Sequence, residues 1–513
     1  MPHRTPRRLI PAAIAGLVAA ASLLGVAELL ALLVERRASP ILAVSAFVVD
    51  VVPRPLKEFA ITTFGDADKV VLLLSVGAAA VVGAALAGVL ELLRRPFGAV
   101  LLALAGVAAT AATATRAGVL PVVAAIPPAV GTAVGVLVLL LLVRRLRVWR
   151  DAEPAGSPVA RRDFLRLSLI AGAGAVVLGV GARAFDALTS AGGAIRDALR
   201  LPAPGSRVTI PAGAVLDIEG ITPLITPNAD FYRVDTALTV PEVDPATWTL
   251  TVTGMVENEV TLTFDDLVGM GVDEYGITMT CVSNEVGGNL LGNAIWLGVP
   301  VRDILAMASP QRGADMVLSR SVDGYTASTP LGALTDDGLD AILAVGMNGE
   351  PLPLEHGFPV RMVVPGLYGY VSATKWLTEL EVTTFEQDEA YWTPRGYSAE
   401  APIKLSSRID TPRVDRAVDA GAVTIAGMAW AQPVGVGAVE VQIDDGAWQP
   451  ATLSTPINDS SWVQWYVDWE ATSGTHYVAV RATDRAGTVQ TEERAPIAPN
   501  GSSGLQRTLI RVN

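Results

Sequence analysis

The segment Tyr275–Pro300 has the sequence YGITMTCVSNEVGGNLLGNAIWLGVP, and its centre is Cys281, the only cysteine among 513 residues. The alternating run 277–280 before Cys281 predicts a half-buried strand. The Gly- and Asn-rich run 284–293 after it predicts a loop with unusual backbone angles. A thiol between such a strand and such a loop is well placed to contact a ligand.

A buried structural role for Cys281 is the alternative, because a free cysteine often behaves as a small hydrophobic residue. Nucleophilic catalysis would need a nearby base. The chain has only three histidines, so a zinc site made of cysteine and histidine alone is almost excluded. If Cys281 binds a metal, that metal arrives inside a cofactor that supplies the other ligands.

The composition combines an apolar, basic first part with an acidic remainder. Hydrophobic residues make up 51% of the chain and the mean hydropathy is +0.43, which is too apolar for an ordinary soluble enzyme. Residues 1–200 hold 21 Lys/Arg against 12 Asp/Glu, and residues 201–513 hold 17 against 39. The acidic remainder argues against nucleic acid as a partner, because that binding requires neutralised phosphates.

Five apolar runs are long enough to cross a bilayer, namely 9–34, 69–93, 97–119, 120–143 and 164–185. We therefore expect a four-span transmembrane region over residues 1–150 and a fifth transmembrane anchor within residues 151–200. The run 41–52 is shorter and stops at Pro53, which favours an interfacial or re-entrant segment.

Arginine clusters set the predicted orientation. Twelve arginines face the cytoplasm if everything after Phe185 lies outside the membrane: Arg4, Arg7, Arg8, Arg94, Arg95, Arg144, Arg145, Arg147, Arg150, Arg161, Arg162 and Arg166. The contrary evidence is a group that then falls outside, made of Arg36, Arg37, Arg54 and Lys57.

The fifth run begins with Ala160-Arg161-Arg162-Asp163-Phe164-Leu165-Arg166, which resembles a twin-arginine export signal. An ordinary cytoplasmic arginine flank is the alternative. No small-residue cleavage site is obvious after Phe185, so we expect the helix to stay as an anchor. The predicted location is the bacterial cell membrane, multi-pass, with the C-terminal domains extracytoplasmic.

From Leu201 the pattern changes to short strands punctuated by Pro and Gly. Residues 201–404 predict an α+β domain, with a strand at Thr249–Gly254 and short helices at 264–267 and 301–305. The polar run 406–419 suggests a linker. The following strands, at 423–430, 439–443, 462–469, 476–483 and 506–512, predict an all-β immunoglobulin-like sandwich within residues 405–513.

Residues 205–513 resemble the sulfite oxidase family of molybdenum enzymes in several ordered blocks. Met279-Thr280-Cys281-Val282-Ser283-Asn284 resembles the block around the family's molybdenum-binding cysteine, and Tyr325-Thr326-Ala327-Ser328-Thr329-Pro330-Leu331 resembles the block with its active-site tyrosine. His356-Gly357-Phe358-Pro359-Val360-Arg361 and Lys375-Trp376-Leu377 follow in the family's order. The resemblance implies a molybdenum–molybdopterin cofactor whose metal is bound by Cys281.

The same resemblance implies roles for other residues. Positive charge and donors for the pterin phosphate would come from His356, Arg361 and Lys375. The block Pro227–Arg233 resembles one in the bacterial reductase branch, which adds Asn228, Phe231, Tyr232 and, less directly, Ser321 as cofactor contacts. Arg233 would lie beside the oxo ligand, and Tyr325 would orient an oxygen or relay a proton.

Departures from the family pattern disfavour sulfite as substrate. Val234-Asp235 follows Arg233 where sulfite oxidases have Asn-His, and Glu285 stands where they have basic residues. The turn after Trp430 contains no arginine. A pocket with fewer positive groups should hold a doubly charged oxyanion poorly.

The sequence therefore predicts a membrane-anchored molybdopterin oxidoreductase that transfers an oxygen atom at a sulfur or nitrogen centre. Sulfite oxidation is the first alternative, and an inactive envelope binding or scaffold protein is the second. Because no Cys-x-x-Cys-His haem motif is present, electrons would pass through a separate cytochrome or the quinone pool. The family resemblance also implies a homodimer formed through the C-terminal sandwich.

Overall fold

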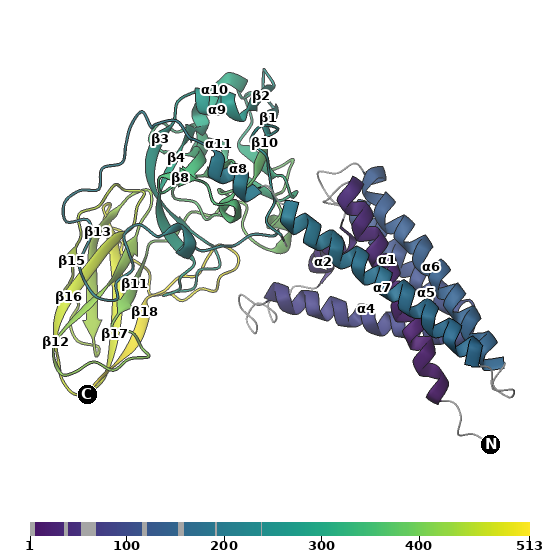
Figure 1. Ribbon diagram of the computed structural model, residues 1–513. Coiled ribbons are helices and arrows are strands. Elements are labelled where there is room, and N and C mark those ends of the chain that lie inside the picture. Colours follow the sequence, from purple (N-terminus) through teal and green to yellow (C-terminus); the bar gives the residue numbers. More distant parts are fainter. Residues whose placement is uncertain are drawn as a thin grey trace. The chain divides into compact units, whose positions relative to one another are not determined.

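The structure is a computed structural model that describes residues 6–34, 39–52, 68–114, 121–151, 158–189, 192–237 and 239–513. The chain divides into two compact units, Met1–Ser190 and Ala191–Asn513, and Figure 1 shows helices in the first and mainly strands in the second. Five basic residues used for the predicted orientation lie outside the described residues: Arg4, Arg36, Arg37, Arg54 and Lys57.

The first unit contains the helices α1 (Pro6–Val34), α2 (Pro40–Val51), α4 (Asp68–Leu93), α5 (Phe97–Ala114), α6 (Pro121–Asp151) and α7 (Pro158–Thr189). In the part of the chain that the structure describes, four helices are long and apolar enough to cross a membrane. They are Leu9–Val34, Leu74–Leu93, Phe97–Ala114 and Pro121–Trp149, which correspond to the first four predicted runs. The fifth run lies in α7, and its crossing of a membrane stays a prediction.

Helix α1 packs against α4, α6 and α7. Small residues allow the close contact with α4, because a Cβ atom added at Gly16 would overlap the carbonyl oxygen of Ala84. The same close contact is seen from α4, where a Cβ at Gly88 would overlap the carbonyl oxygen of Ala12 in α1. This is the small-residue contact expected between helices in lipid.

The second unit begins with α8 (Gly192–Ala198) and then builds two five-stranded sheets. The first has the order β2 (Val260–Thr263), β1 (Thr249–Gly254), β10 (Leu377–Thr383), β5 (Met316–Ser321) and β6 (Thr326–Pro330). The second contains β3 (Asp273–Thr280), β4 (Leu291–Pro300), β7 (Ile342–Met347) and β8 (Glu350–Pro351), and β9 (Arg361–Val363) pairs with β7. The short helices α9 (Phe264–Gly269), α10 (Val301–Ala308) and α11 (Leu331–Thr335) complete this α+β part.

The C-terminal part contains two four-stranded sheets. One has the order β11 (Ser406–Thr411), β12 (Gly421–Trp430), β16 (Val463–Ala471) and β15 (Thr452–Leu453). The other has the order β14 (Gln449–Pro450), β13 (Val436–Ile443), β17 (Gly474–Asp484) and β18 (Gln506–Val512). Aliphatic residues and Trp465 from both sheets share one buried core. The sheets are confirmed, whereas their immunoglobulin-like topology stays a prediction.

The start of the predicted linker is instead a strand. Residues 406–411 form β11, which pairs with β12, and Ser407, Arg408 and Ile409 are all buried. The polar residues that suggested a linker have partners inside the unit, since Arg408 pairs with Asp410 at 2.7 Å and the Ser407 hydroxyl donates to Gln490 at 2.7 Å.

Hydrogen bonds from the C-terminal part also fix β3, the strand that leads to Cys281. The Gln432 side-chain amide donates to the Thr278 carbonyl at 2.6 Å, and the Thr278 amide donates to the Ser460 carbonyl at 3.0 Å. The Trp462 backbone amide donates to the Thr278 hydroxyl at 2.8 Å. Strand β3 is therefore fixed both by its sheet and by the C-terminal part of the same unit.

Candidate functional site

Cys281 lies directly after β3, as predicted, and begins a short loop that returns to β4. Its amide donates to the Leu290 carbonyl at 2.9 Å, and the Asn284 side chain accepts from the Leu290 amide at 2.9 Å. Gly287 in this loop has a φ of +80°, which requires glycine. The loop is thus fixed at both ends, and the thiol, 8% exposed, faces a cavity.

The cavity opens to solvent, and the space counted out to its mouth, about 770 Å³, includes part of that solvent. Eight of the ten predicted site residues line it: Phe231, Tyr232, Cys281, Ser321, Tyr325, His356, Arg361 and Lys375. The first and the last of these residues, Phe231 and Lys375, are 144 positions apart in the sequence. Only the fold brings them into one cavity.

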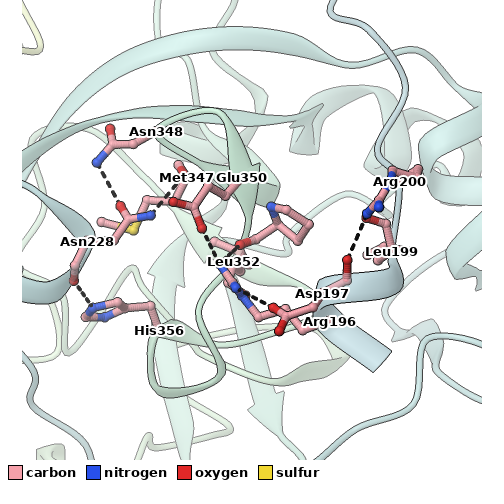
Figure 2. Close-up of polar contacts among 11 residues, drawn as sticks. Arg196, Asp197, Leu199, Arg200, Asn228, Met347, Asn348, Glu350, Leu352 and His356 are labelled. Carbon is pink, nitrogen blue, oxygen red and sulfur yellow. Dashed lines mark hydrogen bonds and ion pairs between the residues drawn. The ribbon is translucent and has the colours of Figure 1, made fainter. Parts of the chain in front are cut away.

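The remaining two predicted residues, Asn228 and Arg233, are not among the lining residues that the structure describes. The Asn228 amide donates to the Met347 carbonyl at 3.3 Å and accepts from the Asn348 side chain at 2.8 Å (Figure 2). Arg233 is 40% exposed, and its Nε donates to Asp235 at 2.9 Å. The roles predicted for Asn228 and Arg233 stay predictions. The backbone carbonyl of Asn228 lies 3.2 Å from Nε2 of His356, which lines the cavity (Figure 2).

Arg361 is a buried cation whose charge has no carboxylate partner within ion-pair distance among the described residues. Its side chain is 4% exposed, and its guanidinium donates to the His356 carbonyl at 3.1 Å and lies over Trp296, 5.2 Å from the ring centre. Its Nε has no hydrogen-bond partner in the part of the chain that the structure describes. Burial lowers the pKa of Arg361 to about 10, so the group is still charged at neutral pH.

The other two basic residues of the cavity, His356 and Lys375, contribute less uncompensated positive charge than Arg361. Burial, with the positive charges of Arg361 and Lys375, lowers the pKa of His356 to about 4, so its imidazole is neutral at pH 7. Burial also lowers the pKa of Lys375 to about 8, although Asp235 opposes this shift. The Lys375 ammonium is 2.8 Å from the Asp235 carboxylate and 2.9 Å from the Glu355 carbonyl.

Two tyrosines of the cavity stay protonated. Burial, with the nearby Cys281 sulfur, raises the pKa of both Tyr232 and Tyr325 far above the usual value. The Tyr325 hydroxyl donates to the Tyr370 carbonyl at 2.8 Å. Tyr325 is therefore a fixed hydroxyl near the thiol rather than a phenolate.

These residues fit a molybdenum–molybdopterin group. Burial raises the pKa of the Cys281 thiol, so it keeps its proton until a metal displaces it, and the Ser283 amide donates to Sγ at 3.4 Å. The Arg361 guanidinium has no carboxylate partner among the described residues and keeps a free Nε, which suits a phosphate. Cys281 and Arg361 line the same cavity.

Sequence reasoning missed part of the lining, including Asp235, Asp323, Tyr370 and Trp392. Asp235 was noted only as a departure from a family motif. Asp323 and Tyr370 each lie within a few residues of a predicted site residue, which was the available signal. For Trp392 the sequence offers no such signal.

Comparison with known proteins finds a domain family over the middle of the chain. A family model described as the oxidoreductase molybdopterin binding domain matches residues 237–392. The chain is 32% identical over 321 residues to the mitochondrial sulfite oxidase of Homo sapiens, across 53% of this chain and 58% of that protein. It is 29% identical over 320 residues to a nitrate reductase [NAD(P)H] of Hordeum vulgare, across 49% of this chain and 35% of that protein.

A solved structure, the sulfane dehydrogenase SoxCD from Paracoccus pantotrophus, matches with a TM-score of 0.49 and 22% identity. The match covers 56% of this chain and 83% of that one. The chain spans little more than half the length of the mammalian sulfite oxidases it matches.

Proposed function

Residues 237–392 form a molybdopterin-binding oxidoreductase domain of the sulfite oxidase family, and we propose that it transfers an oxygen atom at a sulfur or nitrogen centre. The single observation that carries the proposal is that one cavity holds both the only cysteine of the sequence and a buried arginine without an acidic partner among the described residues. When bound, the cofactor supplies a redox-active metal and the oxygen that is exchanged.

The chain's own residues would hold that group and its substrate. Cys281 would ligate the metal, Arg361 would bind the phosphate through its free Nε, and neutral His356 would contribute its ring without adding charge. Tyr325 keeps its proton, and its hydroxyl would orient an oxygen by exchanging the Tyr370 carbonyl for that oxygen. Asn228 and Arg233 are proposed as supporting contacts.

The overall reaction is a two-electron exchange. Reduction of an S- or N-oxide consumes two electrons and two protons and yields the thioether or amine plus water. A separate cytochrome or the quinone pool would supply the electrons. The four apolar helices, with α7 as a fifth span, would anchor the chain in a membrane and leave the cavity extracytoplasmic. A homodimer through the C-terminal sheets is part of the same proposal.

Sulfite oxidation is the second candidate, favoured by the name of the human relative. In that reaction sulfite and water give sulfate, two electrons and two protons. Purified full-length protein should be assayed with sulfite plus an electron acceptor, and with reduced methyl viologen plus sulfoxides or N-oxides.

Metal analysis tests the enzyme itself. We expect near-stoichiometric molybdenum and pterin in the wild type, a Mo(V) electron paramagnetic resonance signal, and loss of metal in Cys281→Ala. An isolated wild type without molybdenum, from cells that make the cofactor, would favour a binding or scaffold protein instead.

A further inference from the structure

The cavity beside the Cys281 thiol contains charged side chains of both signs, but they are not equally balanced. Asp235 is ion-paired with Lys375 at 2.8 Å and with Arg233 at 2.9 Å. His356 is neutral, and Arg361 is buried and suited to the cofactor phosphate. Asp235 is therefore shared by two cations, and Asp323 is the second carboxylate that lines the cavity.

Asp323 has no basic side chain within ion-pair distance in the part of the chain that the structure describes. Its oxygens accept from the Tyr325 amide at 3.3 Å and the Thr236 hydroxyl at 3.5 Å. Both bonds are long and both donors are neutral, so they leave the negative charge in place. That charge reaches the reacting region, because Asp323 contributes to raising the pKa of Tyr325.

Aromatic rings surround the same region. Tyr325, Tyr370 and Trp392 line the cavity with Asp323. Behind them the rings continue, since Tyr391 lies 5.7 Å from Tyr325 and 5.2 Å from Trp392 between ring centres. Aromatic faces next to a carboxylate attract organic cations, whereas they repel oxyanions.

We infer that Asp323 and Trp392 select substrates whose organic body is positively charged, and that Asp323 discriminates against oxyanions. This inference rests on the proposed oxygen-atom transfer and names its substrate class: a cationic organic S- or N-oxide, with its reduced thioether or amine as the product. Asp323 is a specificity-determining residue in this scheme, since it contacts the body of the substrate and not the exchanged oxygen.

The test uses full-length holoenzyme in detergent with three aryl methyl sulfoxides of similar shape. Their para substituents are trimethylammonium, tert-butyl and sulfonate, and reduced methyl viologen donates the electrons. We expect kcat/KM to fall in that order, about tenfold between the cation and the neutral compound. The difference should lie mainly in KM.

Two variants and a salt series locate the effect. Asp323→Asn keeps the oxygen that accepts from the Tyr325 amide, and it should remove the advantage of the cation over the neutral compound. The control, Asp337→Asn, alters a fully exposed carboxylate outside the cavity and should preserve the order. In the wild type, added NaCl should raise KM for the cation and not for the neutral compound, a measurement that needs no variant.

Failure of this inference is distinguishable from failure of the proposed function. Turnover in which the cation has no advantage, or in which its KM does not respond to salt, overturns the role of Asp323 and leaves oxygen-atom transfer standing. No turnover of any sulfoxide, N-oxide or sulfite by molybdenum-loaded protein overturns the proposed function itself.

Discussion

The Lys375 ammonium and the Asp235 carboxylate form an ion pair at 2.8 Å with side chains only 9% and 5% exposed. Asp235→Asn should lower the free energy of unfolding by about 2–4 kcal/mol, because it leaves a buried charge uncompensated. Lys375→Met in addition should restore part of that loss, with a coupling of about 1–3 kcal/mol. Urea unfolding followed by tryptophan fluorescence measures this, since nine of the ten tryptophans lie in residues 191–513. Strict additivity of the two substitutions would contradict the pair's contribution.

Arg361→Met should separate cofactor binding from folding. Removing an uncompensated buried charge relieves its desolvation, so the cofactor-free variant should unfold within about 1 kcal/mol of the wild type despite the lost hydrogen bonds. Its pterin content after expression in cofactor-producing cells should fall by an order of magnitude or more, because the phosphate loses its cation. The measurements are urea unfolding and fluorescence of the released, oxidised pterin. A strongly destabilised variant would show instead that Arg361 is a structural residue.

Because His356 is buried in its neutral form, we expect the cofactor-free protein to lose stability in mild acid. Its pKa is about 4 in the folded state and near 6.5 unfolded, so the unfolded chain alone binds the proton between these values. Stability is complete above about pH 6.5 and falls as the pH drops towards 4, by at most about 3 kcal/mol. His356→Gln should flatten this part of the pH profile of unfolding free energy.

His476 provides a control of opposite sign. Its hydrogen bonds to Asp444 and Thr472 raise its pKa, so its contribution is complete below the unfolded pKa and is lost as the pH rises through the folded value. His476→Gln should therefore leave the acid-side loss intact. A wild-type profile that stays flat from pH 6.5 to 4 would contradict the burial of a neutral His356.

Two glycines of α4 should respond differently to substitution. A Cβ at Gly88 would overlap Ala12 of α1, whereas a Cβ at Gly83 has nothing within 4 Å. Gly88→Ala should cost about 1–3 kcal/mol by forcing the helices apart. Gly83→Ala should be neutral or stabilising, since alanine favours the helix by about 1 kcal/mol. Circular dichroism at 222 nm in detergent compares the thermal midpoints, and equal effects of both would argue against the α1–α4 contact.

Strands with clear alternation and turn residues at both ends could be predicted closely. Thr249–Gly254 and Gln506–Val512 were found at their predicted bounds. The two-residue strands β14 and β15 could not be predicted, because two residues carry no periodicity. The site residues followed from ordered blocks that resemble a known family. Asp323 and Trp392 did not, because sequence patterns give the face of a strand and not the distance between segments.

The hydrogen bonds from the C-terminal part to β3 have a consequence for biosynthesis. Gln432 and Trp462 follow their partner Thr278 by 154 and 184 residues, so the strand ahead of Cys281 lacks these supports while the ribosome is still making the middle of the chain. The lining of the cavity, which ends at Trp392, is therefore synthesised before the groups that hold β3 in place.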